Sequence, residues 1–254
     1  MHSRTISLSV VIPAYNEEAN FRAGVLDPVL EFLHRQDYAW ELLFVDDGST
    51  DDTYQLLSDL SRQESRVHVL HIPHGGKAAA VTAGMLAARG DIILFTDFDQ
   101  STPLDQVQKF LAAHQAGADV VIGHRVSTLH DTLVRRLRSW TFVTFVQIIA
   151  LPGISDTQCG FKSFTKVSAR KVFSSLKVCL PKSTVAGSYM GAFDVEALFL
   201  ARKFGFFVKQ VPVTWIKIAS DRLNIWKEPL KMAVDTLKIR IWDILDLYGQ
   251  STAH

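Results

Sequence analysis

Short apolar runs recur along the first half of the chain, and each is followed by a longer stretch with the spacing or composition of a helix. The runs predict strands, and the stretches between them predict helices, one reaching about Gln36 and an alanine-rich one reaching Arg89. The predicted strands are residues 8–12, 41–45, 67–72, 92–95 and 119–122. This alternation is typical of an α/β fold in which helices cover both faces of a mostly parallel sheet.

Polar residues follow each of the first four predicted strands. The first strand leads into residues 13–18, where Pro13 is expected to end the hydrogen-bonded ladder, and the second leads into residues 46–51. The third leads to Gly75-Gly76-Lys77 and the fourth to Asp97-Phe98-Asp99. Because parallel strands end at the same edge of an open sheet, where ligands bind, these four ends predict one site.

The two carboxylates after the fourth strand predict a metal site. Asp97 and Asp99 follow the apolar run directly, so we expect the strand to end there, and Thr102-Pro103 indicates a new helix just beyond. Two converging carboxylates suit a hard divalent cation, which would hold the phosphates of a substrate. The alternative is a solvated turn whose Asp side chains cap the next helix.

Composition narrows the class of protein. A chain of 254 residues with 48% hydrophobic residues can form one large α/β domain, which we favour over two small ones. Its 27 Lys and Arg against 26 Asp and Glu argue against general nucleic-acid binding. Cys159 and Cys179 form neither a metal motif nor a disulfide framework, and no signal peptide or membrane-spanning run is recognisable, so we expect a cytoplasmic protein.

Three competing motifs fit the residues poorly. Gly76-Lys77 is not a Walker loop, because His71 stands where that motif needs Gly and Ala78 where it needs Ser or Thr. A zinc site of histidines at three-residue spacing is disfavoured, because His68 and His71 would point to opposite faces of a strand. A haloacid-dehalogenase-like phosphatase with Asp97 as nucleophile leaves the polar residues after the first two strands without a role.

Residues 10–18, 44–51, 75–77 and 97–99, in this order and spacing, resemble the family-2 inverting glycosyltransferases, which have the GT-A fold. The likeness continues through three further segments, residues 123–125, 156–162 and 193–196, which are similar to polyprenyl-phosphate sugar synthases. It is greatest to dolichyl-phosphate β-glucosyltransferases, with the dolichyl-phosphate mannose synthases somewhat further away. The resemblance implies a Rossmann-like catalytic domain at residues 1–223, and apolar residues at helical spacing predict an amphipathic helical segment at residues 224–254.

The resemblance also implies a donor site. The residues expected to bind the nucleotide-sugar are Pro13, Ala14, Tyr15, Glu17, Asp46, Lys77, Asp97, Phe98, Asp99 and Arg222. Of these, Asp97 and Asp99 would hold Mg²⁺ or Mn²⁺ on the diphosphate and stabilise the departing nucleotide. Ser101 stands where mannose synthases have a Gln that helps at the metal, which favours glucose from UDP-glucose over mannose from GDP-mannose.

On the acceptor side, the resemblance assigns the lipid phosphate to Arg135 and Ser139, which are four residues apart and share a helical face. Arg125 would lie between donor and acceptor, and Asp156 would orient or balance the charge of the arginines. A phosphate acceptor is already ionised near pH 7, so no general base is required. The alternative for the arginines is a solvated basic helix face.

Two apolar segments bear on the membrane. Residues 140–151 are apolar but too few to cross a bilayer, so they predict either an interfacial helix or a core helix. Residues 226–248 have apolar positions at helical spacing and would pack on the domain, a partner or a membrane. Because a polyprenyl tail stays in the bilayer, we expect a peripheral protein at the cytoplasmic face of a membrane.

The sequence therefore predicts inverting transfer of glucose from UDP-glucose to a polyprenyl phosphate, dolichyl or undecaprenyl. A GDP-mannose-dependent synthase is the second prediction. From different classes, a metal-dependent phosphatase and a non-catalytic nucleotide-binding module stay open, as does the oligomeric state.

Overall fold

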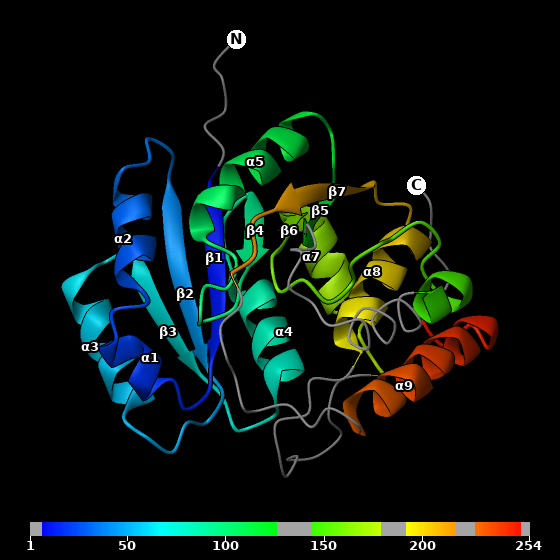
Figure 1. Ribbon diagram of the computed structural model, residues 1–254, viewed down its shortest axis with the longest axis horizontal. Helices are drawn as coiled ribbons and strands as arrows, with labels where there is room; N and C mark the ends of the chain where they lie inside the picture. The colour runs from blue at the N-terminus through cyan, green and yellow to red at the C-terminus, as the bar shows by residue number, and fades with distance from the viewer. Residues whose placement is uncertain (1–6, 126–143, 179–191, 217–226, 250–254) are drawn as a thin grey trace.

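The computed structural model describes residues 7–125, 144–178, 192–216 and 227–249. These residues form a seven-stranded sheet in the order β3-β2-β1-β4-β6-β5-β7 (Figure 1). The strands are β1 (Leu8–Ala14), β2 (Trp40–Asp46), β3 (Val67–His71), β4 (Ile92–Phe95), β5 (Val120–Arg125), β6 (Lys162–Thr165) and β7 (Val208–Val213). All neighbouring strands are parallel except β6, which runs antiparallel to both β4 and β5. The predicted mostly parallel α/β sheet is confirmed.

Helices cover both faces of this sheet, because successive strand residues enter opposite cores. In β1, Val11 packs in one hydrophobic cluster, with helices α4, α7 and α8, while Val10 and Ile12 pack in the other, with α2, α3 and α5. The helices are α1 (Glu18–Arg22), α2 (Asp27–His34), α3 (Thr53–Gln63), α4 (Lys77–Ala87), α5 (Val107–Gln115), α7 (Lys166–Phe173), α8 (Phe193–Lys203) and α9 (Lys227–Ile244), with a 3-10 turn, η1 (Leu104–Gln106), before α5.

The prediction that Pro13 ends the first strand is wrong. β1 continues through Pro13 to Ala14, which pair with Val45 and Asp46 of β2. The carbonyl of Val11 faces β4, where it accepts a hydrogen bond from Thr96, so the nitrogen of Pro13, two residues on, faces the same side. The pairing of β1 with β4 stops at Val11. Proline has no N–H, but at position 13 the sheet needs no hydrogen bond from that side.

The single helix expected to reach about Gln36 is also wrong. Two helices, α1 and α2, stand in its place, separated by a turn at Gly24. Gly24 has φ 73°, a left-handed conformation that favours glycine, and its carbonyl accepts a hydrogen bond from the N–H of Asp27 at 3.1 Å. The turn lets α2 pack Val29 and Leu33 into the core beneath β1 and β2.

The C-terminal prediction of helical spacing is confirmed by α9, which has both polar and apolar side chains on its inward face and on its outward face. Polar Asp235 and Thr236 face inward with Ile239, whereas the outward face carries apolar side chains: Val234, Leu237, Ile241 and, at the end of the helix, Ile244. Whether residues 1–223 and 224–254 form separate units stays a prediction. Within the described part of the chain, no helix has both the length and the apolar character of a membrane span.

The apolar segment at residues 140–151 is described only from residue 144. Residues 144–149 are helical, and Val146, Ala150 and Leu151 belong to the hydrophobic core. Ile148, by contrast, is 74% exposed. The core interpretation therefore holds for Val146, Ala150 and Leu151 but not for Ile148, and residues 140–143 lie outside the described residues.

Candidate active site

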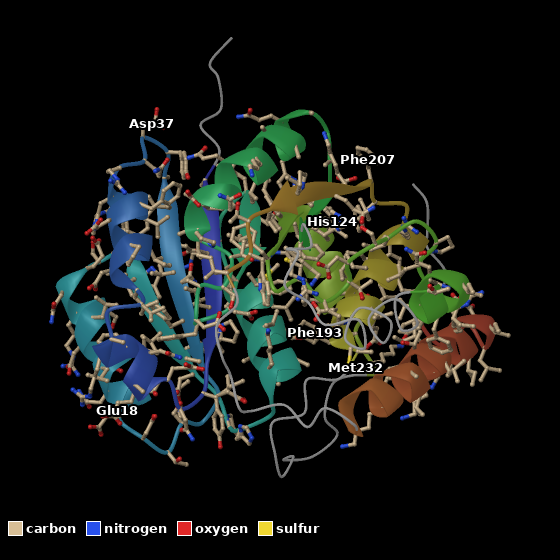
Figure 2. All side chains as sticks on the ribbon, viewed as in Figure 1. Glu18, Asp37, His124, Phe193, Phe207 and Met232 are labelled. Atoms are coloured by element: carbon tan, nitrogen blue, oxygen red, sulfur yellow. The ribbon has the colours of Figure 1, made fainter. Side chains whose placement is uncertain are left out.

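The site lies at the sheet edge where β1, β2 and β4 end. Figure 2 places Glu18 at this edge, just after β1, and Asp37 at the opposite edge, just before β2. The chain segments that follow β1, β2, β3, β4 and β5 all begin at this edge, because these strands share one direction. The sequence motifs at residues 13–18, 46–51, 75–77 and 97–99 therefore meet here.

Asp97 and Asp99 follow β4 on a turn, as predicted. Gln100, with φ 53°, completes the turn, and the backbone N–H and the hydroxyl of Ser101 both donate to Asp99 Oδ1 at 2.9 Å. The Oδ2 atoms of Asp97 and Asp99 accept no hydrogen bond from the described residues. Phe98, which was predicted to bind the donor, points the opposite way and packs its side chain in the core near Phe44, because the two flanking carboxylates face the site.

Gly160 lies directly against Asp97. A Cβ at Gly160 would stand 2.1 Å from Asp97 Oδ2, so no other residue fits without displacing the carboxylate or the turn. This turn precedes β6 and is held from below by Lys162, whose ammonium donates to the Cys159 carbonyl and, at 2.6 Å, to Asp194 of α8. Lys162 is fully buried, so this ion pair supports the turn beside the predicted metal ligands Asp97 and Asp99, the metal-side carboxylates.

Lys77 is the first residue of α4 and reaches the same carboxylates. Gly76 before it adopts φ 83° and ψ 171°, and the Lys77 ammonium donates to Asp97 Oδ1. Burial acts to lower the pKa of Lys77, but the carboxylates of Asp97, Asp194 and Asp99 outweigh it and raise this pKa above its usual value. Lys77 is therefore a permanent positive charge beside the predicted metal ligands.

The end of β2 forms the other side of the site. Asp46 is fully buried, and its Oδ2 lies 2.7 Å from His71 Nδ1 at the end of β3. Its Oδ1 is buried and has no hydrogen-bond partner among the described residues, an arrangement that is costly unless a ligand supplies a donor. Tyr15 stacks on His74, with ring centroids 4.3 Å apart, beside this carboxylate's strand.

Predicted residues at the end of β1 and in the loop after it form hydrogen bonds with the segment that follows β2. The Ala14 carbonyl accepts a hydrogen bond from the N–H of Asp47 at 2.9 Å, and the N–H of Glu17 donates to Thr53 Oγ1 at 2.7 Å. Asn16, with φ 53°, accepts from the N–H of Thr50 at 2.8 Å through its side-chain oxygen. These bonds tie the loop after β1 to the loop after β2.

Arg125, at the end of β5, forms a two-pronged ion pair with Asp156. Its Nε and Nη2 donate to the two carboxylate oxygens at 2.7 and 2.9 Å, and the guanidinium carbon lies 5.6 Å from the Trp215 ring. Burial acts to raise the pKa of Asp156, but Arg125 outweighs it, so this pKa lies below its usual value. Asp156 thus faces Arg125; the Asp156 carboxylate is buried, whereas the Arg125 side chain is about one-third exposed.

Sequence reasoning missed four residues at this edge. His71 and His74 pair with Asp46 and Asp47, and the buried pair of Lys162 and Asp194 lies beneath Asp97. The register of β2 on β3, which places Asp46 beside His71, is the signal that could have found the histidines. By contrast, Arg135, Ser139 and Arg222, three predicted ligand-binding residues, lie outside the described residues.

Residues 9–173, about two thirds of the chain, match a family model with the description "Glycosyl transferase family 2". The chain belongs to this family. The resemblance deduced from the sequence motifs is confirmed, and the protein is a glycosyltransferase. Residues 9–173 include β1 to β6 and therefore most of the site edge described above.

Three relatives to which the chain is similar share one name, dolichyl-phosphate beta-glucosyltransferase. The protein is 35% identical over 256 residues to the dolichyl-phosphate beta-glucosyltransferase of Drosophila melanogaster, covering 93% of this chain and 75% of that protein. The enzymes of the same name from Dictyostelium discoideum and Homo sapiens are each 31% identical, and each match covers at least 94% of this chain and 76% of the relative.

Solved structures share the fold. Glucosyl-3-phosphoglycerate synthase from Mycobacterium tuberculosis, solved with Mn²⁺, UDP and glucosyl-3-phosphoglycerate, matches with a TM-score of 0.62 at 20% identity, over 92% of this chain and 80% of that one. Mannosyl-3-phosphoglycerate synthase from Rubrobacter xylanophilus matches with a TM-score of 0.63 at 16% identity, over 98% and 77%. These neighbours confirm the predicted GT-A fold.

Proposed function

We propose that this glycosyltransferase transfers glucose from UDP-glucose to a polyprenyl phosphate and inverts the anomeric configuration. The activity for which the relatives are named, dolichyl-phosphate beta-glucosyltransferase, supports this proposal over most of the chain. The observation that carries it is the convergence of Asp97, Asp99 and Lys77 at one end of the site and the orphaned Asp46 Oδ1 at the other. This layout matches a nucleoside diphosphate, which has a donor-bearing base at one end and phosphates at the other.

A divalent cation fits the metal end of the site. Asp97 and Asp99 offer hard carboxylate oxygens, and Oδ2 of each is uncommitted among the described residues. When bound there, Mg²⁺ or Mn²⁺ would neutralise charge that develops on the departing diphosphate. Lys77, held at Asp97, is well placed to bind the same phosphates, and Gly160 keeps the space that the Asp97 carboxylate needs.

We assign the acceptor phosphate to Arg135 and Ser139, with Arg125 between donor and acceptor. Arg125 is positioned by the two-pronged bond to Asp156, and the carboxylates of Asp156 and Asp97 together raise the pKa of Arg125 above its usual value although burial acts to lower it. A phosphate monoester carries at least one negative charge at neutral pH and needs no base to become a nucleophile. The Asp156 carboxylate, already paired with Arg125, therefore acts as an orienting group and not as a proton acceptor.

A lipid acceptor requires that the enzyme work at a membrane surface. The outward apolar face of α9 and the exposed Ile148 support peripheral binding, because apolar side chains of this kind enter the boundary between headgroups and acyl chains. We propose that this binding takes place at the cytoplasmic face of the membrane. Vesicle sedimentation with and without polyprenyl phosphate measures this binding.

A donor panel tests the proposal. Purified protein, Mn²⁺ and a short polyprenyl phosphate are incubated separately with UDP-glucose, GDP-mannose and UDP-N-acetylglucosamine, and sugar-lipid and released phosphate are quantified. We expect glucosyl-lipid with UDP-glucose and release of UDP in equal amounts. Mannosyl-lipid alone would instead support the mannose synthase, while nucleotide binding without any sugar-lipid would contradict the proposal.

A further inference from the structure

The carboxylate of Asp47 holds the loop that precedes α4 at three points. Its Oδ1 accepts the N–H of Gly75 at 2.8 Å, and its Oδ2 accepts the N–H of Gly76 at 2.9 Å. His74 Nδ1 lies 2.9 Å from the same Oδ2 and 3.0 Å from the Asp47 carbonyl oxygen. Asp47 is only 2% exposed, so these bonds are shielded from water and from competing donors.

The backbone on both sides of these bonds leaves little freedom. Gly48 has φ 67°, and a Cβ there would stand 2.9 Å from the backbone nitrogen of His74, so the loops after β2 and β3 are in direct contact. Gly76 has φ 83°, a conformation that L side chains rarely adopt. The Asp47 carboxylate binds the N–H of the Gly76 peptide unit, while the Gly76 carbonyl accepts the first helical bonds, from Ala79 and Ala80.

The consequence reaches both ends of the proposed donor site. Lys77, which follows Gly76 directly, donates to Asp97 at the metal end. His74, held by the same carboxylate, stacks on Tyr15 at the nucleoside end. One buried side chain therefore sets the start of α4, the direction of Lys77 and the position of the ring against Tyr15.

We infer that Asp47 is a positioning residue for donor binding: it acts through the His74-Gly75-Gly76 loop to hold Lys77 at the metal-side carboxylates and His74 against Tyr15. It touches neither the metal nor the diphosphate itself. The inference deepens the proposed function and rests on it for the identity of the donor. The positioning role of Asp47 would be the same for any nucleoside diphosphate that binds at this edge.

The variant Asp47→Asn tests the inference with little change in volume. Its amide oxygen can accept only one of the two glycine N–H groups, and its NH₂ group would face the other donor. We expect UDP affinity, measured by calorimetry with Mn²⁺, to fall about tenfold and kcat to fall about tenfold, with KM for the acceptor unchanged. The matched control is Asp119→Asn, because Asp119 also accepts a backbone N–H, that of Phe207, but at the opposite edge of the sheet.

A double-mutant cycle with Lys77→Ala separates positioning from general stability. Because Asp47 is inferred to act through both Lys77 and His74, Asp47→Asn should weaken nucleotide binding less in the Lys77→Ala background than in the wild-type background, and the remaining loss is that of the His74 contact with Tyr15. An additive loss, equal in both backgrounds, would overturn the inference. If Asp47→Asn does not fold, Asp47→Glu is used in the same cycle, because it keeps the negative charge but displaces both carboxylate oxygens from the N–H groups of Gly75 and Gly76.

The two proposals fail in different ways. A wild-type protein that binds UDP with Mn²⁺ but transfers no glucose overturns the proposed function, while the cycle on UDP binding still decides the role of Asp47. If GDP binds in place of UDP, the cycle is run with GDP. A wild-type protein that binds neither nucleotide overturns both proposals.

Discussion

The contact between Gly160 and Asp97 gives a sharp test of the metal end of the site. A Cβ at position 160 would lie 2.1 Å from Asp97 Oδ2, whereas real Cβ atoms essentially never come closer than 3.0 Å to a neighbour. The turn that carries Gly160 is anchored by buried Lys162, while the Asp97 side chain is about one-third exposed, so the carboxylate is the part that moves. In Gly160→Ala it must retreat by roughly 1 Å, a misplacement that can cost on the order of 10² in rate.

The expected loss in kcat/KM is therefore about 100-fold, or about 2.7 kcal/mol of transition-state stabilisation. The Mn²⁺ concentration for half-maximal activity should rise as well, because Asp97 is displaced from the metal position. Gly160 does not have a positive φ, so alanine adds no backbone strain there, and the melting temperature should change little.

The matched control is Gly117→Ala. Gly117 has φ 95°, and a Cβ there would meet no atom of the described residues within 4 Å, so alanine strains the backbone without touching a neighbour. This control should lower the melting temperature and leave kcat/KM and the Mn²⁺ dependence unchanged. Wild-type kinetics in Gly160→Ala would refute the close approach of Gly160 to a metal-binding Asp97.

Three further outcomes follow from the site. Asp99→Ala should remove most turnover, and EDTA should do so reversibly; full activity in EDTA, measured by sugar-lipid formation, would contradict a metal at Asp97 and Asp99. Arg135→Ala should raise KM for the polyprenyl phosphate and leave the calorimetric affinity for UDP nearly unchanged, and an equal loss of both would show that Arg135 is not confined to the acceptor. The pH profile of kcat/KM should fall on the acid side near pH 6, where the acceptor phosphate gains a proton, and stay flat to about pH 9. Because the pKa of Asp156 is lowered, its ion pair with Arg125 is complete above the ordinary Asp range and is lost only at lower pH, so an acid limb that moves in Asp156→Asn would contradict the assignment.

The presence and order of the strands in the first half could be predicted from the sequence, because each apolar run is bounded by turn residues. The runs at residues 8–12, 41–45, 67–72 and 92–95 each overlap an observed strand. Strand β6 gave no such signal, because Lys162-Ser163-Phe164-Thr165 reads as polar and its lysine is buried only through the distant Asp194. A local pattern does not reveal a partner that lies 32 residues away along the chain.

The histidines of β3 also show that a local sequence pattern does not reveal which residue a side chain contacts. Alternation along β3 predicts opposite faces for His68 and His71, but it did not predict what His71 contacts. That contact depends on the parallel register that sets His71 beside Asp46, and register follows from the packing of two strands, not from either one alone. The site residues on loops after strands were predictable in kind, while their partners were not.

The described structure also explains why two lysines are compatible with a cation site. Lys162, Asp194, Lys77 and Asp97 alternate in charge from the core to the site edge: Lys162 pairs with Asp194, and Lys77 pairs with Asp97 while its pKa is raised by both aspartates. Each buried charge thus has an opposite neighbour, which offsets the cost of removing it from water. A divalent cation bound with a diphosphate adds two positive and at least two negative charges, so the added charge can balance within the ligand pair itself. The protein's carboxylates and lysines can therefore hold their positions before and after the donor binds, which is the condition for stabilising a leaving group without reorganisation.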